Sequence, residues 1–347
     1  MSTPAPDGTP SSTAAILVVG PSRVSDSVLA QALFKVLLAE SPGIAIDVIA
    51  PTRILPLLAC MPEVRRGIEA PQSRGLSGAI ECWRLGRSLR GFYRRAIVLG
   101  EDWRTAVVPF AAKIPQRSGW RGQLHSLLLN DARRLDTTCH PTTLQRYAAL
   151  AVGGNARPPA LQVPRFDVRV ADVQATMQAL GVQKAARRRV LALCPGAEYG
   201  PARHWPMLNF AELGRQFARE GWDIWLFGSA GDLAVSEGVA ATCKVVTNLV
   251  GRTTLKQAVD LLSLADAVVA NDSGLMHLAA ALGRPLVAVY GPSDPVMAPP
   301  FSQPSRLVRL GLLCSPCDKR ECPLGTTACM VDMPVEQVAD ALHAVTA

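Results

Sequence analysis

Residues 271–277 read Asn-Asp-Ser-Gly-Leu-Met-His, and this stretch decides the fold because of what lies on either side of it. The preceding residues 266–270 are mostly apolar and rich in β-branched side chains, which predicts a buried strand. The following residues 278–282 are strong helix formers, and Gly283 and Pro285 end the helix. A strand, a short polar loop and a helix in this order are typical of a parallel α/β sheet.

The loop between the strand and the helix has the features of an anion site. Asp272 or Ser273 is the expected N-cap, and the backbone N–H groups from Gly274 to Met276 are predicted to face outward unpaired. Such a helix start also carries partial positive charge, so it suits a diphosphate. His277 lies four residues after Ser273 and shares its face of the helix. An ordinary capped helix with a surface histidine has the same local sequence. The choice between this alternative and an anion site therefore depends on the rest of the chain.

The alternation of strand and helix patterns recurs along the chain. Gly- and Pro-rich residues 153–164 have the composition of a linker. We therefore expect two open, parallel, doubly wound α/β domains at 15–165 and 166–347, with ligands at the carboxyl ends of the strands. Buried strands are predicted at 16–19, 45–49, 96–99, 190–193, 223–227, 266–270 and 286–290, and helices at 28–38, 105–112, 210–220, 255–264 and 278–282.

The bulk composition is that of a globular protein. Of the 347 residues, 49% are hydrophobic and 18% are charged, which excludes a disordered chain. No apolar run approaches the length of a membrane span. Residues 1–14 are predicted to form a disordered tail, and they lack the basic start and long apolar centre of a signal peptide. The expected location is therefore cytoplasmic.

Positive charge is concentrated in the amino-terminal half. Residues 53–134 hold 15 Lys and Arg against 6 Asp and Glu, a net charge of +9, whereas the whole chain carries +8. Such an excess indicates an anionic partner: nucleic acid, a phosphorylated ligand or an anionic membrane face. The alternative is that the arginines simply solvate helix faces. No nucleic-acid fold signature accompanies the charge, so a membrane surface or a phosphorylated acceptor is preferred.

Nine cysteines fall into two groups. Four form the pattern Cys314-x2-Cys317-x4-Cys322-x6-Cys329, which in a reducing compartment favours a structural zinc or iron–sulfur site, although it fits neither standard spacing closely. Labile disulfides or free thiols remain the alternatives for these four. The other five are scattered and are predicted to be small core residues: Cys60, Cys82, Cys139, Cys194 and Cys243.

Several of these segments together resemble glycosyltransferase family 9, the ADP-heptose transferases of lipopolysaccharide core synthesis. The resemblance runs in collinear order from about Ile16 to the carboxyl terminus. It implies a GT-B type fold, in which an acceptor-binding Rossmann-like domain and an ADP-heptose-binding one face a central cleft. The matching segments are 16–26, 119–122 with 129–131, 194–206, 271–277 and 290–293.

The resemblance also implies roles for individual residues. Asp26 matches the catalytic base that takes a proton from the acceptor hydroxyl, although it could instead cap the helix predicted to begin at Val28. Arg203 stands where the family usually has Lys and would bind the diphosphate bidentately. The other residues of the implied donor site are Gly196, Ala197, Asp272, Ser273, Gly274, Met276 and His277, and those of the acceptor site are Ser22, Arg117 and Arg121.

The implied reaction is inverting transfer of L-glycero-D-manno-heptose from ADP-heptose to the first heptose of the inner core on Kdo–lipid A. The partners would be ADP-heptose, the lipopolysaccharide acceptor and, peripherally, the cytoplasmic face of the inner membrane, but no nucleic acid. No cofactor would be needed for catalysis. The alternatives are a different acceptor, such as Kdo or another core sugar, and an inactive relative that only binds nucleotide or metal.

Two departures from the family pattern bear on these expectations. Ser25 replaces the glycine that usually precedes the catalytic aspartate, and a side chain there could crowd the acceptor or alter the loop. Thr326 and Thr327 stand where part of the family has a histidine near the cysteines. Any metal site would therefore depend on the four thiols alone.

Overall fold

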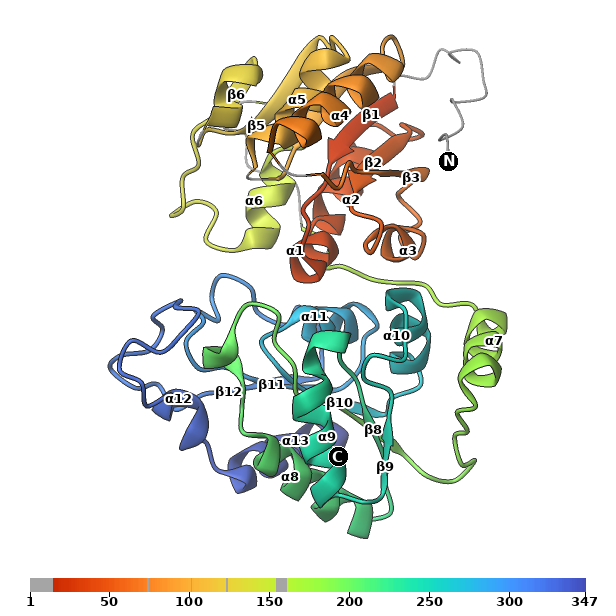
Figure 1. Cartoon of the computed structure of the whole chain (residues 1–347), viewed down its shortest axis with the longest axis vertical. Coiled ribbons are helices and arrows are strands. Elements are labelled where there is room, and N and C mark those ends of the chain that lie inside the picture. Colours follow the sequence, from red (N-terminus) through yellow and green to blue (C-terminus); the bar gives the residue numbers. More distant parts are fainter. Residues whose placement is uncertain (1–14, 74, 101, 123, 154–160) are drawn as a thin grey trace. The chain divides into compact units, whose positions relative to one another are not determined.

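The structure is a computed structural model that describes residues 15–73, 75–100, 102–122, 124–153 and 161–347 (Figure 1). It divides into two compact units, Met1–Gln162 and Val163–Ala347, a division that lies three residues before the boundary predicted after residue 165. The tail predicted at 1–14 and most of the linker predicted at 153–164 lie outside the described residues. The cleft expected between the units concerns their mutual placement and stays a prediction.

The first unit is a parallel six-stranded sheet with the order β3-β2-β1-β4-β5-β6. Two of its strands, 15–19 and 46–50, are buried along their whole length because helices cover both faces of the sheet, as in other doubly wound proteins. The strands are β1 (Ala15–Val19), β2 (Ile46–Ala50), β3 (Arg66–Glu69), β4 (Tyr93–Val98), β5 (Gln116–Trp120) and β6 (Asp131–Arg133). The helices are α1 (Val24–Leu29), α2 (Gln31–Glu40), α3 (Leu55–Leu58), α4 (Gly75–Ser88), α5 (Trp103–Ala111), η1 (Leu124–Leu128) and α6 (Thr143–Ala149).

The second unit repeats this arrangement with the order β12-β11-β10-β7-β8-β9, again entirely parallel. The strands are β7 (Val190–Cys194), β8 (Asp223–Leu226), β9 (Val246–Asn248), β10 (Ala267–Asn271), β11 (Leu286–Val289) and β12 (Ser305–Val308). The helices are α7 (Val170–Leu180), η2 (Pro201–Arg203), α8 (Met207–Arg219), η3 (Ala230–Asp232), α9 (Leu233–Thr242), α10 (Leu255–Leu262), α11 (Gly274–Ala281), α12 (Ala328–Val331) and α13 (Val335–Thr346).

Each sheet has one point where the direction of strand addition reverses. In the first unit the chain moves outward from β1 to β2 on one side and from β4 to β5 on the other, so this point lies between β1 and β4. In the second unit it lies between β7 and β10 for the same reason. Ligands of open parallel sheets bind beyond the carboxyl ends of the strands at such a point. The two loops that follow β1 and β10 are therefore where sites are expected.

The two-domain parallel α/β fold is confirmed, and so is each of the seven predicted strands, with ends shifted by a few residues at most. The helix predicted at 28–38 is wrong at its start, because α1 begins at Val24 and a separate helix, α2, begins at Gln31. Cys139 is exposed rather than part of a core, because it lies in the turn that Asp136 caps. None of the helices that the structure describes is long and apolar enough to cross a membrane.

Candidate functional site

The first unit holds a cavity of about 380 Å³ at the carboxyl ends of its strands. Residues 20–23 after β1, 49–51 at the end of β2, 70–71 after β3 and 99–100 after β4 line it, together with Asp26 of α1. The cavity thus lies at the point between β1 and β4 where the strand order reverses. Its size lies within the range of small-molecule binding sites.

Asp26 lies half-buried in the first turn of α1, facing this cavity. The N-cap of α1 is Arg23, so the alternative role of Asp26 as a helix cap is wrong. The Ser27 hydroxyl donates to the Arg23 carbonyl at 2.8 Å and holds the loop against the helix, a contact that sequence reasoning missed. Ser25 has ordinary helical backbone, so replacing the family's glycine there introduces no backbone strain. A carboxylate in a first helical turn is favoured by the helix dipole.

The three predicted acceptor residues are not all near this cavity. Ser22 lines it and is exposed. Arg117 does not line it: its Nε and Nη1 donate to the carbonyls of Leu128 and Ile114 at 2.8 and 2.7 Å, and burial lowers its pKa. Arg121 is exposed on the loop after β5 and does not line it either. The structure therefore brings only Ser22 together with Asp26.

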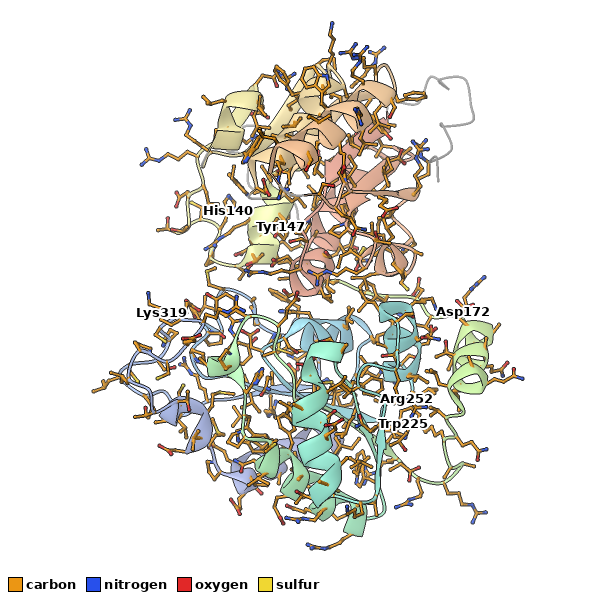
Figure 2. The ribbon with its side chains drawn as sticks, in the orientation of Figure 1. His140, Tyr147, Asp172, Trp225, Arg252 and Lys319 are labelled. Atoms are coloured by element: carbon orange, nitrogen blue, oxygen red, sulfur yellow. The ribbon has the colours of Figure 1, made fainter. Side chains whose placement is uncertain are left out.

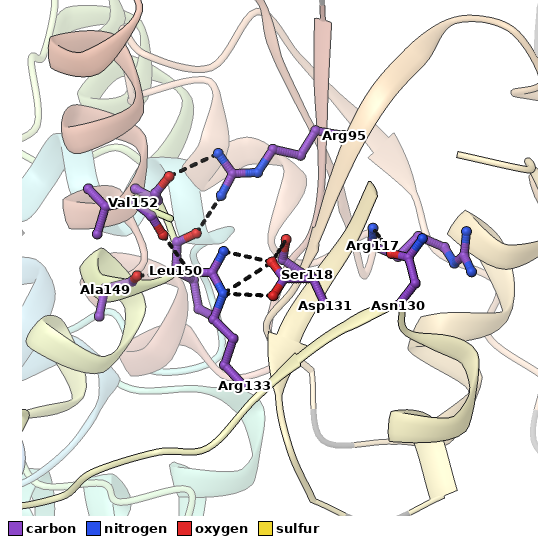
Figure 3. Close-up of polar contacts among 10 residues, drawn as sticks. Arg95, Arg117, Ser118, Asn130, Asp131, Arg133, Ala149, Leu150 and Val152 are labelled. Carbon is purple, nitrogen blue, oxygen red and sulfur yellow. Dashed lines mark hydrogen bonds and ion pairs between the residues drawn. The ribbon is translucent and has the colours of Figure 1, made fainter. Parts of the chain in front are cut away.

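Part of the basic excess of this unit is structural. Arg95 on β4 donates to the carbonyls of Ala151 and Leu150 at 2.9 and 2.7 Å, just beyond the end of α6 (Figure 3). Arg133 on β6 pairs with Asp131 at 2.7 Å beside the same helix end. Arginines placed at helix carboxyl ends satisfy the last carbonyls and the helix dipole. The terminal guanidinium nitrogens of Arg95 and Arg133 are therefore committed to partners within this unit.

The far wall of the cavity contains an ion pair that sequence reasoning missed. Asp102 caps α5, accepting from the Arg104 N–H at 3.0 Å, and Arg104 Nε donates to it at 2.9 Å. The hydrogen bond from the Arg104 side chain lowers the pKa of Asp102. Arg104 also donates to the Ser73 carbonyl at 2.9 Å. Tyr147 of α6, labelled in Figure 2, lines the cavity as well, so hydroxyl, carboxylate and guanidinium groups all face it.

In the second unit, Asn271 joins the two predicted donor loops. Its side-chain N–H donates to the Pro195 carbonyl at 2.7 Å, and its side-chain oxygen accepts from the Trp205 N–H at 3.2 Å. Asn271 is fully buried at the end of β10, so both hydrogen bonds are shielded from water. The loop 195–205 is therefore held beside the residues that follow β10.

Arg203 and Asp272 meet within this arrangement. Arg203 Nη1 lies 2.6 Å from Asp272 Oδ2, and the two side chains are only 18% and 10% exposed. The guanidinium carbon lies 4.1 Å from the centre of the Tyr199 ring, a cation–π contact. Arg203 Nε is buried without a hydrogen-bond partner in the part of the chain that the structure describes. The ion pair and the ring contact thus hold the guanidinium in place, with 18% of the side chain left exposed.

The start of α11 completes the set. Ser273 is the N-cap, as predicted, and its hydroxyl oxygen accepts from the Met276 N–H at 3.4 Å, so that N–H is not unpaired. Met276 is fully buried against the Tyr290 hydroxyl, 3.4 Å from its sulfur. Gly274 opens the helix, where backbone N–H groups have no intrahelical acceptor. This helix start therefore offers donors and positive dipole charge to a diphosphate.

His277 is a buried core residue rather than a surface one. It is 2% exposed, and its Nε2 has no hydrogen-bond partner among the described residues. Burial is the largest influence on its pKa, which falls to about 4 with a smaller contribution from Arg203, while Asp272 acts in the opposite direction. The imidazole is therefore neutral near pH 7 and can donate or accept one hydrogen bond.

Gly196 lies beside an acidic residue that sequence reasoning passed over. A Cβ on Gly196 would lie 2.3 Å from Asp232 Cγ, so only glycine allows this approach. Asp232 follows β8 and accepts from the Ser229 N–H at 2.8 Å. Ala197 is 7% exposed, and its carbonyl contacts His204 Nε2 at 3.3 Å. The Gly- and Ser-rich loop after β8 was the signal that could have identified Asp232.

The four cysteines of the cluster lie together, but without the geometry of the predicted metal site among the described residues. Cys314, Cys317, Cys322 and Cys329 line one small hollow of about 30 Å³, and all are free thiols, Cys314 being exposed. The described residues nevertheless include no group of three or more His, Cys, Asp or Glu placed to hold an ion. Cys322 accepts from the Thr327 N–H, which lowers its pKa, whereas burial raises the pKa of Cys329. The zinc or iron–sulfur prediction is therefore not supported.

Both the sequence and the structure of this chain are similar to those of known proteins. The family profile described as glycosyltransferase family 9 (heptosyltransferase) matches residues 82–328. The chain is 40% identical to lipopolysaccharide heptosyltransferase 2 of Salmonella typhimurium over 94% of this chain and 97% of the relative, and equally to that of Escherichia coli over 95% and 97%. A solved structure, E. coli ADP-heptose lps heptosyltransferase II, superposes with a TM-score of 0.85 at 39% identity, covering 95% of this chain and 98% of the other.

Proposed function

This chain belongs to glycosyltransferase family 9 and is a heptosyltransferase of lipopolysaccharide core biosynthesis, and from that premise we propose its substrates and the residues that handle them. The donor is ADP-heptose. The acceptor is the first heptose of the inner core, carried on Kdo–lipid A. Transfer proceeds with inversion, as expected of a single displacement assisted by one base.

Asp26 and its cavity carry this proposal. The carboxylate of Asp26 takes the proton of an acceptor hydroxyl while that oxygen forms a bond to C1 of the heptose. The bond from C1 to the diphosphate oxygen breaks, and ADP leaves. The cavity around Asp26 supports this role because it places hydroxyl and charged groups of Ser22, Tyr147 and Arg104 where a sugar would need hydrogen-bond partners.

The leaving diphosphate is bound by the second unit. Arg203 pairs with it, and the first turn of α11 after Ser273 and Gly274 donates backbone N–H groups to it. Both contacts strengthen as charge develops on the departing oxygen, which is the requirement for catalysis rather than mere binding. His277, which the family resemblance assigns to the donor site, is buried at this helix start and stays neutral, so it adds no charge there. Gly196 and Ala197, in the loop after β7, contribute backbone N–H groups near the phosphates.

No cofactor is proposed for catalysis, and the chain is placed at the cytoplasmic face of the inner membrane, in peripheral contact with it. The lipid anchor of the acceptor supports that location. Arg121 remains a candidate for an acceptor phosphate because it is exposed. Arg117 is a weaker candidate, because its Nε and Nη1 are committed to backbone carbonyls.

ADP release measured with defined acceptors tests this function. The purified protein is offered ADP-heptose with heptosyl-Kdo–lipid A, with Kdo–lipid A lacking heptose, or with no acceptor. Turnover that requires the first heptose supports the proposal. Preference for the heptose-free acceptor would reassign the chain to an earlier transfer. Donor binding by calorimetry without turnover on any acceptor would identify an inactive relative.

A further inference from the structure

Helices α4 and α5 expose a group of large apolar side chains, here called the α4–α5 patch. The patch consists of Leu76, Ile80 and Trp83 on α4 and Trp103 and Phe110 on α5. Ile80 is 53% exposed, Trp83 42% and Phe110 41%, and the rings of Trp83 and Phe110 lie 6.2 Å apart. Both helices lie next to each other in the first unit (Figure 1). Apolar side chains gathered in this way indicate an interaction surface.

The spacing along α4 shows that the patch is one face of an amphipathic helix. Leu76, Ile80 and Trp83 are separated by four and three residues and therefore share a face. The other face is buried on α5 through small residues. A Cβ on Gly86 would lie 2.4 Å from the Val108 carbonyl oxygen, so the two helices approach closely. The patch is thus carried by a tightly packed helix pair.

Positive charge surrounds the patch. Arg84 and Arg87 are exposed on α4 beside the apolar strip, and Lys113 is exposed just after α5. The guanidinium carbon of Arg117 lies 5.6 Å from the centre of the Phe110 ring. Residues 75–121 contain nine Lys and Arg against three Asp and Glu. A partner for this surface must therefore accept aromatic side chains and also carry negative charge.

The same two helices form a wall of the cavity that holds Asp26. Cys82 of α4 and Arg104, Thr105 and Val108 of α5 line that cavity, while the patch lies on other faces of these helices. A surface that engages the patch is consequently one helix layer away from the proposed acceptor site. This proximity matters for an acceptor whose sugar must reach Asp26 while its lipid stays in a bilayer.

We propose that the α4–α5 patch docks the protein on an anionic phospholipid surface, an inference that rests on the proposed lipid-anchored acceptor. Tryptophan and phenylalanine insert at the boundary between headgroups and acyl chains, and arginines around them attract anionic headgroups. Charge complementarity therefore favours a membrane over an apolar protein partner. Docking in this way presents the membrane-held acceptor sugar to the cavity behind α4 and α5.

Vesicle flotation without any substrate tests the docking. The wild-type protein is expected to float with vesicles that contain phosphatidylglycerol and to float less with phosphatidylcholine alone, and added salt should weaken the binding. Ile80→Ser combined with Trp83→Ser should reduce binding about tenfold. Arg84→Glu combined with Arg87→Glu should reduce binding to the anionic vesicles by a similar factor of about ten. Leu208→Ser, at a 58% exposed position on α8, and Arg219→Glu are matched controls that should bind like wild type.

Turnover distinguishes this inference from the proposed function. The Ile80/Trp83 variant should keep its ADP release with a deacylated, water-soluble acceptor and lose it with an acceptor embedded in vesicles. No turnover with either acceptor in the wild type would overturn the proposed function while leaving vesicle binding to be judged on its own. Equal flotation of wild type and patch variants would overturn the docking. So would a concentration-dependent dimer that the Ile80/Trp83 variant abolishes, since the patch would then bind a second copy.

Discussion

Arg203 Nη1 lies 2.6 Å from Asp272 Oδ2, and this pair connects the two loops that follow β7 and β10. Both side chains are largely shielded from water, so each charge depends on the other for compensation. Under the proposed function, the diphosphate of the donor would offer Arg203 a second anion. The ion pair therefore holds the guanidinium in position before the donor arrives.

Replacing Arg203 should weaken nucleotide binding. In Arg203→Ala, ADP and ADP-heptose should each bind more weakly by about 1.5–3 kcal/mol, and the difference from wild type should shrink at high salt. Arg203→Lys should lose less, because it keeps the charge but not the planar donor pair. Isothermal calorimetry measures both, with Arg219→Ala on α8 as the control. Unchanged affinity in Arg203→Ala would place the diphosphate elsewhere.

Replacing Asp26 should abolish turnover and spare donor binding. Asp26→Asn removes the proton acceptor, so turnover should fall on the order of a hundredfold or more. ADP-heptose affinity should change little, since Asp26 and the donor residues belong to different units. ADP release and calorimetry give the two quantities, and Asp136→Asn, another acid of the first unit, is the control. Near-wild-type turnover would remove Asp26 from the mechanism.

The buried His277 should make stability depend on pH. Its pKa is about 4 in the folded protein against an ordinary 6.5, so between these values the unfolded chain binds a proton that the folded chain does not. The free energy of unfolding should therefore fall as the pH drops from 6.5 towards 4, by up to about 3 kcal/mol. Urea unfolding at several pH values measures this. His277→Gln should flatten that part of the curve and His343→Gln, at a half-exposed site, should not. A pKa of His277 near 6.5, measured by NMR titration, would contradict this prediction.

Asp47 should be a stability residue without a catalytic role. It is fully buried on β2, and it accepts from Arg65 Nε at 2.8 Å, from Arg66 Nε at 2.9 Å and from the Tyr93 hydroxyl at 2.5 Å. Burial alone would raise its pKa, but the hydrogen bonds from Arg65 and Tyr93 and the charge of Arg66 outweigh that and lower it.

Asp47→Asn weakens the hydrogen bonds to two arginines whose side chains are 49% and 37% exposed, so water can solvate them and the free energy of unfolding should fall by about 1–3 kcal/mol. Because the pKa of Asp47 is lowered on folding, its stabilising contribution is present above pH 4 and is lost as the pH falls further. Thermal unfolding of Asp47→Asn, beside Glu40→Gln at an exposed site, measures the effect. A melting temperature equal to that of wild type would show that the network contributes nothing.

The parts of the fold that could be predicted from the sequence are those buried on both faces. Strands such as β1 and β10 are short, almost wholly apolar runs. A strand buried on both faces of a parallel sheet has this pattern, so the sequence predicts it directly. The missed strand β3 alternates exposed and half-buried residues at the sheet edge, so it has no such run. Helix α4 was missed because glycine normally disfavours helices, whereas Gly86 allows its close packing on α5 and Gly78 allows the close approach of the Ser73 carbonyl.

The candidate site divides in the same way. Residues that follow a strand directly, such as Ser273, lie where the sequence pattern predicts them. Long side chains do not, because their direction depends on distant partners. Arg117 turns towards two backbone carbonyls, and His277 lies inside the core. The positions of both side chains depend on how other segments pack, which the local sequence does not show. The cysteine spacing predicted a shared location correctly, but not the ligand geometry that a metal ion needs.

Counted within each unit, both sheets have the same strand order, 3-2-1-4-5-6. The residues proposed for the acceptor and those proposed for the donor belong to different repeats of this plan. With this organisation, substitutions in the acceptor-binding unit can change the sugar linkage that is formed. The unit that binds the nucleotide need not change. It also makes recombination after Gln162 a practical way to build chimeric enzymes, in which the donor-binding unit of one parent protein is joined to the acceptor-binding unit of another.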